Sequence, residues 1–141
     1  MNVAAWSPHL TPERAAAAGV QFISSKEELI RISDVFSLQI VYSESTHHLI
    51  TASDFALMKP SAFFINTSRG PIADEAALIE VLKEKRIKGA ALDVYDVEPL
   101  PLDHPLRELD NVILSPHIAY VSEEHYQASE FSSNRWLTMT H

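Results

Sequence analysis

The sequence predicts an α/β protein, a doubly wound parallel sheet with helices on both faces. Short apolar runs alternate with amphipathic segments along the whole chain, which is the pattern of parallel strands joined by crossover helices. One apolar run, bounded by Pro60 and by Gly70-Pro71, is continuous enough to be a buried strand of a parallel sheet. The 141 residues contain no internal repeat and no low-complexity linker, so we expect one domain over 1–141.

Apolar, β-rich runs mark the expected strands. The run at 62–67 is the central one, and its neighbours are shorter runs that end at polar or proline-containing turns. The expected strands are residues 3–6, 35–41, 62–67, 89–94 and 111–114, with a small extra strand at 21–23. Right-handed crossovers place the carboxyl ends of parallel strands on one rim of the sheet.

Capping residues mark the expected helices between these strands. Thr11 and Ser25 precede two of them, Thr51 or Ser53 precedes a short third one, and Asp74 precedes a long amphipathic one. The first helix begins at Pro12 and ends at Gly19, the second covers 26–32, the third covers 54–58, and residues 122–139 have a helical pattern.

The composition excludes several classes of protein. Hydrophobic residues make up 46% and charged residues 21%, which is typical of a globular chain. The net charge of −8 argues against a nucleic-acid partner, and no apolar run reaches the roughly 20 residues needed to cross a membrane. We expect no metal site, because the seven histidines lack the spacing of ligands. Without cysteine or a signal-peptide pattern, we expect a cytoplasmic protein.

Polar side chains follow the expected strands at their carboxyl ends, which lie together on one rim of the sheet. They supply hydroxyl, amide, acid, base and guanidinium groups, whereas the strand interiors are apolar. These residues are Ser7 and His9, then Gln39, then Thr67, Ser68 and Arg69, then Asp93, Asp96 and Glu98, and finally Ser115 and His117. Ligands of open α/β sheets bind just beyond the carboxyl ends of the strands, so we expect a binding site here.

Three of these residues have the chemistry of a proton-transfer site. The guanidinium of Arg69 suits a carboxylate, and the imidazole of His117 can donate and accept a proton near neutral pH. The carboxylate of Glu98 could orient His117 and favour its protonated form. Such a set can protonate a carbonyl oxygen as hydride reaches the carbon, and can reverse the reaction for an alcohol. Each residue alone has a simpler reading, as a surface arginine, a capping histidine or a solvated acid.

Several motifs resemble, in order and spacing, those of the D-isomer-specific 2-hydroxyacid dehydrogenases. They are Asn66-Thr67-Ser68-Arg69-Gly70, Leu92-Asp93-Val94 with Glu98-Pro99, and Ser115-Pro116-His117-Ile118, together with Ala56-Leu57-Met58-Lys59-Pro60 and Asp74-Glu75-Ala76-Ala77-Leu78. The resemblance runs from about residue 1 to residue 136. It implies a Rossmann-like sheet, incomplete here, and assigns 1–141 to part of an NAD(P)-binding domain.

The resemblance implies a role for each matching residue. Arg69 is similar to the family's substrate-binding arginine, Glu98 to its histidine-orienting acid, and His117 to its proton donor and acceptor. The implied reaction is hydride transfer between NAD or NADP and a small 2-hydroxy or 2-oxo acid. The implied cofactor contacts are Ser7, Ile40, Thr67, Ser68, Arg69, Asp93 and His117. Ser7 stands where the family often has an acid that binds the adenosine ribose, which leaves the choice between NAD and NADP open.

The chain also departs from the family pattern. The family's dinucleotide fold opens with a strand, a glycine-rich turn and a helix, whereas the three glycines here, Gly19, Gly70 and Gly89, are far apart in the sequence. The first strand here resembles the family's second, so we expect a strand to be missing between residues 3–6 and 62–67. The family's substrate domain is also expected to be missing. We therefore expect a truncated dehydrogenase that binds cofactor weakly by itself.

Two function classes remain open at this point. One is an oxidoreductase, or a part of one. The other is a catalytically silent dinucleotide-binding or scaffold protein, as in the nucleotide-sensing co-repressors among the family's relatives. A phosphate-receiver domain of the same sheet class is disfavoured, because Trp6-Ser7-Pro8 supplies no acidic cluster. The resemblance is also compatible with a homodimer.

Overall fold

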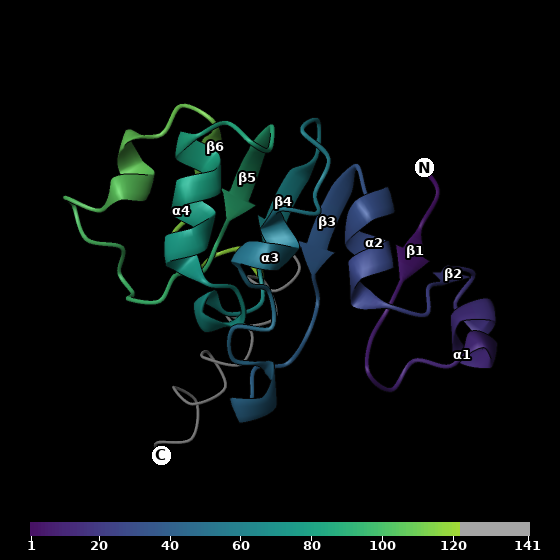
Figure 1. Cartoon of the computed structure of the whole chain (residues 1–141). Coiled ribbons are helices and arrows are strands. Elements are labelled where there is room, and N and C mark those ends of the chain that lie inside the picture. Colours follow the sequence, from purple (N-terminus) through teal and green to yellow (C-terminus); the bar gives the residue numbers. More distant parts are fainter. Residues whose placement is uncertain (122–141) are drawn as a thin grey trace, which may run out of the picture.

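The computed structural model describes residues 1–121 of the chain. Their strands are all parallel and form two sheets, one of two strands in the order β1-β2 and one of four strands in the order β3-β4-β5-β6 (Figure 1). Strands and helices alternate along these residues. The predicted α/β class with parallel strands is therefore confirmed.

Each expected apolar run contains a strand that is shorter than the run. The short sheet holds β1 (Ala4–Ala5) and β2 (Gln21–Phe22). The long sheet holds β3 (Val35–Leu38), β4 (Phe63–Asn66), β5 (Gly89–Leu92) and β6 (Val112–Leu114). The register places Leu38, Asn66, Leu92 and Leu114 side by side. The carboxyl ends of these four strands therefore lie level at one edge of the sheet, as the sequence predicts.

The predicted caps are present at three helices. The side chains of Thr11, Ser25 and Asp74 each accept a hydrogen bond from the backbone N–H three residues further on. Gly19 follows the first helix with a φ of +69°, which suits glycine. The helices are α1 (Pro12–Ala17), α2 (Lys26–Ile32), α3 (Ala52–Phe55) and α4 (Glu75–Lys83), with 3₁₀ turns η1 (Glu44–Thr46), η2 (Gly70–Ile72) and η3 (Pro105–Glu108).

The helix predicted over 54–58 is wrong in its bounds. It begins after Thr51, which forms a capping box with Asp54, and the N–H groups of Leu57 and Met58 bond three residues back, so the last turn tightens. The helix predicted over 122–139 lies outside the described residues. None of the helices within residues 1–121 has the length and apolar character needed to cross a membrane.

One face of the long sheet is packed against helices. Phe55 of α3 meets Phe64 of β4 edge to face, with 5.2 Å between the ring centroids. Leu78, Val81 and Leu82 of α4 are buried in the same core. The strands contribute every second residue to this core, namely Phe36, Leu38, Phe64, Ala90 and Leu92.

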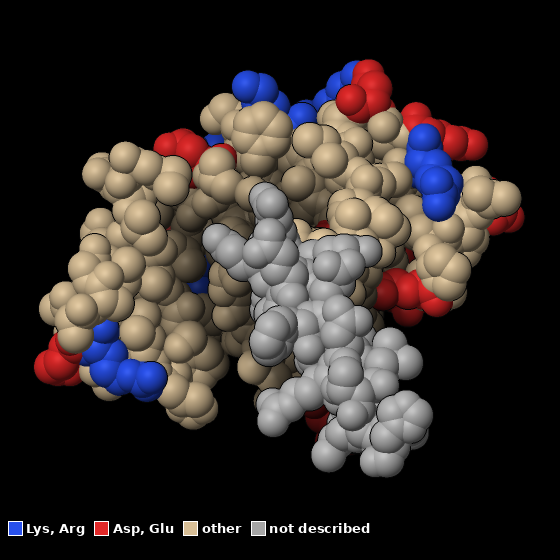
Figure 2. Space-filling model, turned by 180° about the vertical axis from the view of Figure 1, so that it is seen from behind, with Lys and Arg blue, Asp and Glu red and all other residues tan. Residues whose placement is uncertain are grey.

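The opposite face of the long sheet carries apolar side chains that are partly exposed. Val35, Phe63 and Ile113 are 49%, 39% and 72% exposed. Seen from behind, the charged side chains that are visible lie mainly towards the margins of the molecule (Figure 2). Within residues 1–121, α3 and α4 therefore cover one face of the long sheet.

A groove of about 530 Å³ separates β1 from β3. Its walls include Ala4, Ala5, Phe36 and Leu38, and the two strands are not paired with each other. The prediction of a missing strand between residues 3–6 and 62–67 is wrong in its second neighbour, because β4 pairs with β3 along its whole length. The gap lies between β1 and β3. Local apolar patterns identify strands but do not fix their order in the sheet.

Candidate active site

The loop after β4 is fixed by a buried asparagine. Asn66 is 2% exposed; its side-chain amide donates to the carbonyl oxygen of Arg69 at 2.9 Å, and its Oδ1 accepts from the N–H of Ser68 at 3.0 Å. The hydroxyl of Ser68 donates to the carbonyl oxygen of Leu38 at 2.9 Å, which ties the loop to β3. These contacts hold the exposed side chains of Thr67 and Arg69 at the rim.

Gly70 holds the Arg69 loop against the segment after β5. A Cβ at this position would lie 2.1 Å from the carbonyl carbon of Tyr95 and 2.6 Å from the nitrogen of Asp96. Only glycine allows two backbones to approach so closely. The loop that carries Arg69 therefore packs directly on the segment that leads to Glu98.

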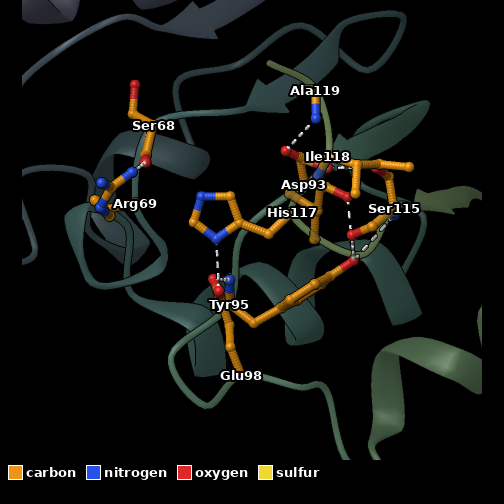
Figure 3. Close-up of polar contacts among 10 residues, drawn as sticks. Ser68, Arg69, Asp93, Tyr95, Glu98, Ser115, His117, Ile118 and Ala119 are labelled. Atoms are coloured by element: carbon orange, nitrogen blue, oxygen red, sulfur yellow. Dashed lines mark hydrogen bonds and ion pairs between the residues drawn. The ribbon is translucent and has the colours of Figure 1, made fainter. Parts of the chain in front are cut away.

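His117 follows β6 and contacts Glu98 (Figure 3). Nδ1 of His117 lies 2.6 Å from Oε2 of Glu98, and Oε1 of Glu98 accepts the N–H of Tyr95 at 3.0 Å. Both side chains remain about one-third exposed, so a ligand can reach them. Because Nδ1 is occupied by the carboxylate, Nε2 is the nitrogen available for exchanging a proton with a ligand.

The turn that presents His117 is held by Asp93. His117 has a φ of 57°, a conformation that is costly for a residue other than glycine and is maintained only by its surroundings. Asp93 is 3% exposed, and its two oxygens accept the N–H groups of Ile118 and Ala119, each at 2.9 Å. The hydroxyl of Ser115 also donates to Asp93. Asp93 therefore positions the histidine through the backbone.

The electrostatics of the site favour ionised carboxylates. Burial works to raise the pKa of Asp93, but hydrogen bonds from Ser115, Ala119 and Ile118 and the charge of His117 outweigh it, so the pKa is lowered. Burial also opposes ionisation of Glu98, but its bonds from His117 and Tyr95 and the charges of His117 and Arg69 lower its pKa. Both acids are therefore anions near neutral pH.

Tyr95 links the ends of β5 and β6. Its hydroxyl lies 2.8 Å from the carbonyl oxygen of Ser115 and 3.1 Å from that of Leu92, and it accepts the N–H of Ser115 at 3.1 Å. Burial is the main reason why the pKa of Tyr95 is raised. This role of Tyr95 is not among the roles expected from the sequence. The available signal was a tyrosine at the end of an apolar strand, since a buried hydroxyl needs a partner.

The predicted site residues line neighbouring hollows at the rim. Ile40, Thr67, Ser68 and Arg69 line one of about 480 Å³. Glu98 and His117 line a second one of about 320 Å³, next to Tyr95 and Ser115. In Figure 3 the imidazole of His117 lies between the Arg69 loop and Asp93. Arg69 is close enough for its charge to act on Glu98.

Ser7 and Asp93 differ in their surroundings from the other predicted cofactor contacts. Ser7 lies at the carboxyl end of β1, on the groove between β1 and β3, and this groove shares Gln39 and Ile40 with the hollow beside Arg69. Each oxygen of Asp93 accepts a hydrogen bond from the chain itself, and its contact with a cofactor stays a prediction. The structure thus brings Arg69, Glu98 and His117 to one region of the rim and leaves Ser7 at another.

A level edge of parallel strands, with an arginine and a paired histidine and glutamate beyond it, places the chain among the α/β proteins that bind ligands beyond the carboxyl ends of their strands. The NAD binding domain of the D-isomer specific 2-hydroxyacid dehydrogenases matches residues 1–119. The chain belongs to this family.

Curated relatives agree with this family assignment. D-3-phosphoglycerate dehydrogenase of Methanocaldococcus jannaschii is 40% identical over 129 residues, which are 92% of this chain and 24% of that protein. Glyoxylate reductase of Thermofilum pendens is 47% identical over 98 residues, which are 70% of this chain and 29% of that protein. The chain therefore spans less than a third of the length of these two relatives.

Solved structures show the same fold, which confirms the Rossmann-like prediction. D-mandelate dehydrogenase of Rhodotorula graminis has a TM-score of 0.81 at 37% identity, over 92% of this chain and 38% of that one. D-lactate dehydrogenase of Lactobacillus jensenii with NAD⁺ has a TM-score of 0.79 at 29% identity, over 95% and 43%. An acyclic imino acid reductase in complex with NADPH and D-Arg has a TM-score of 0.75 at 35% identity, over 91% and 38%.

Proposed function

We propose that the chain is the cofactor-binding part of an oxidoreductase that transfers hydride between a nicotinamide cofactor and a small 2-hydroxy or 2-oxo acid. The observation that carries this proposal is the 2.6 Å contact between Nδ1 of His117 and Glu98, at a rim that also holds Arg69. The names of the relatives, which include a glyoxylate reductase and a D-mandelate dehydrogenase, support small hydroxy acids as the substrate class.

The residues at the rim supply the binding and proton-transfer steps. Arg69 binds the substrate carboxylate through its guanidinium. Nε2 of His117 gives a proton to the carbonyl oxygen during reduction and takes it from the hydroxyl during oxidation. Glu98 holds the ring in place and stabilises its protonated form. The nicotinamide cofactor, when bound, supplies or accepts the hydride.

The described residues fit the nicotinamide end of such a cofactor better than its pyrophosphate. Exposed polar groups of Thr67 and Arg69 line a hollow beside the catalytic pair. The three glycines of the chain are used elsewhere: Gly19 ends α1, Gly70 packs on Tyr95, and a Cβ at Gly89 would lie 2.5 Å from the carbonyl oxygen of Asn111. None of them is free to form a phosphate-binding turn. We therefore propose that the chain alone binds cofactor weakly.

Either NAD or NADP is proposed as the cofactor. The structural relatives include one complex with NAD⁺ and one with NADPH. Ser7, at the end of β1, offers a hydroxyl and not a carboxylate that would repel a 2′-phosphate. Calorimetric titration with NADH and NADPH in parallel decides between them. Much tighter binding of NADH than of NADPH would overturn the role given to Ser7.

The test of the function is NADH-dependent reduction of glyoxylate, hydroxypyruvate and pyruvate. It is applied to the 141-residue chain and to the complete open reading frame that contains it. In the active form, His117→Ala should lower kcat by about 10²- to 10⁴-fold, because the proton donor is lost. His47→Ala, an exposed histidine outside the site, is the matched control. Unchanged turnover in the His117 variant would show that the assigned role is wrong.

A silent dinucleotide-binding or scaffold protein is the second candidate function. The engagement of all three glycines in packing or helix termination favours the scaffold form of this candidate, because it leaves no glycine for a phosphate-binding turn. No turnover in either form, with Arg69, Glu98 and His117 intact, would favour this candidate. Tight NADH binding without turnover would support it directly.

We also propose a cellular location and an assembly for the protein. The absence of cysteine supports a cytoplasmic protein, and the net charge of −8 supports the expectation that nucleic acid is not a partner. A homodimer is proposed as the assembly, and sedimentation equilibrium tests it. A mass of one chain at all concentrations would overturn it.

A further inference from the structure

The segment that carries Glu98 is held at two points by one side chain outside the proposed site. Glu75 is the first residue of α4, and its side chain is 18% exposed. Its Oε2 accepts the N–H of Asp96 at 3.3 Å, and its Oε1 lies 3.2 Å from Nε2 of His104. Glu75 therefore connects α4 to both ends of the segment 96–104.

The hydrogen bonds of His104 fix which of its ring nitrogens carries the proton. Nδ1 accepts the N–H of Leu106 at 3.3 Å, and in this way the side chain caps η3. A nitrogen that accepts a hydrogen bond carries no proton, so the proton of the neutral ring lies on Nε2 and is donated to Glu75. The two oxygens of Glu75 thus face two donors, which are Nε2–H of His104 and the N–H of Asp96.

Glu98 binds the backbone amide next to the one that Glu75 binds. Its Oε1 accepts the N–H of Tyr95 at 3.0 Å, and its Oε2 contacts Nδ1 of His117. The N–H of the following residue, Asp96, is donated to Glu75. Two carboxylates thus bind two successive amides, one from α4 and one from within the segment. A shift of this backbone would therefore move Glu98 relative to His117.

The later part of the segment is held independently of Glu75. Nε and Nη2 of Arg107 donate to the carbonyl oxygens of Pro101 and Leu100, at 2.8 and 2.9 Å. Leu100 is also 8% exposed and belongs to the core. We therefore expect a change at Glu75 to loosen the backbone beside Glu98 without unfolding the chain.

We propose that Glu75 is a positioning residue, which fixes the backbone at Asp96 and η3 at His104 and thereby holds Glu98 in place to orient His117. Glu75 acts only through Glu98. Its effect on the reaction rests on the proposed function, whereas its effect on the pair of Glu98 and His117 is a property of the folded chain.

Carboxyl ¹³C NMR titration of the 141-residue chain tests this role without substrate. Burial acts to raise the pKa of Glu98, but its bonds from His117 and Tyr95 lower it. Glu75→Gln replaces one acceptor oxygen by an NH₂ group that faces a donor, so these bonds should loosen and the pKa of Glu98 should rise. The loss of negative charge at Glu75 would by itself lower this pKa, so the sign of the change separates lost position from lost charge.

Asp96 reports the loss of charge in the same titration. Its pKa is raised first by burial and next by the charge of Glu75, so it should fall in the Glu75→Gln chain. Glu80→Gln removes an exposed acid from the same helix and should leave the titration of Glu98 unchanged.

A second variant tests the position of Glu98 while the charge at Glu75 is kept. His104→Asn retains an acceptor that can cap the N–H of Leu106, but its shorter side chain does not reach Glu75, so the pKa of Glu98 should again rise. Circular dichroism shows which variants are folded, and if one of the two is not, the other decides. An unchanged or lower pKa of Glu98 in either folded variant, or failure of both variants to fold, would overturn the proposal.

Turnover by the complete open reading frame tests the consequence for the reaction. Glu75→Gln should lower kcat for glyoxylate about ten- to hundred-fold and leave KM nearly unchanged, because Arg69 still binds the carboxylate. If the native enzyme has no turnover, the proposed function fails, and the titration of Glu98 still decides the role of Glu75. If the native enzyme is active and the variant has the same kcat, the positioning role alone is overturned.

Discussion

Asn66 and Asp93 are two of the buried polar residues within 1–121, and each lies at or just beyond the carboxyl end of a strand. Asn66 closes the loop that carries Arg69, and Asp93 closes the turn that carries His117. Buried polar side chains that have hydrogen-bond partners favour a single conformation of the surrounding loop, because other conformations would leave these side chains without partners. The side chains of Arg69 and His117 at this rim are therefore positioned by buried residues.

Gly70→Ala should destabilise the chain. The new methyl group would meet backbone atoms of Tyr95 and Asp96, which cannot move without displacing the segment that holds Glu98. Overpacking of this kind costs about 1–3 kcal/mol. Urea unfolding measures the loss.

Gly19→Asn is the matched control for this variant. Gly19 has a positive φ of +69° and no neighbour within 4 Å, and asparagine tolerates that conformation. Its free energy of unfolding should fall by about 1 kcal/mol or less, because asparagine adopts the left-handed conformation at a smaller cost than most other residues. Equal stability of the two variants would show that the contact at Gly70 is not tight.

At the scale of elements, the sequence predicts what depends on neighbouring residues. Thr11, Ser25 and Asp74 cap helices as expected, because an N-cap is a contact over three residues. The position of the gap beside β3 and the role of Asp93 depend on contacts between segments that are far apart in the sequence, and local patterns do not reveal such contacts. The bonds of Asn66 span only two and three residues, which is typical of an asparagine that stabilises a turn. The pairing of Glu98 with His117 was foreseen from the chemistry of the two side chains and from the common rim.

Phe63 and Phe64 of β4 should respond differently to truncation. Phe64 is 0% exposed and packs on Phe36 and Phe55, so Phe64→Ala should cost about 3–5 kcal/mol. Phe63 is 39% exposed on the opposite face, and Phe63→Ala should cost less than half as much. Guanidinium unfolding compares the two. Similar losses would mean that both faces of β4 are buried in solution.

For the molecule as a whole, the long sheet has a core of its own that the short sheet does not join. Ile30 of α2 lies in this core with Phe64 and Leu82, whereas the buried residues Ala15 and Ile23, next to the short sheet, lie outside it. The net charge of −8 adds self-repulsion to this incomplete sheet. Stability should therefore depend strongly on pH, through the acids that the fold holds ionised.

Acid should destabilise the chain progressively between about pH 5 and pH 2, partly through Asp93. Unfolded aspartate takes up a proton near pH 4, whereas the pKa of Asp93 is lowered in the folded chain. The unfolded state therefore binds more protons, and the stabilisation is lost as the pH falls through the folded pKa. The lowered pKa of Glu98 acts in the same direction. The raised pKa of Asp96, caused first by burial, acts in the opposite direction.

Asp93→Asn isolates the contribution of this carboxylate. At pH 7 the variant should lose about 1–3 kcal/mol of unfolding free energy, because an amide cannot accept all of the hydrogen bonds that the carboxylate accepts. As the pH falls, the native curve should approach that of the variant. Asp103→Asn removes the same charge from an exposed position and should keep the native slope. Urea unfolding at a series of pH values gives both curves, and parallel curves for native and Asp93→Asn chains would mean that Asp93 is not held ionised by the turn at His117.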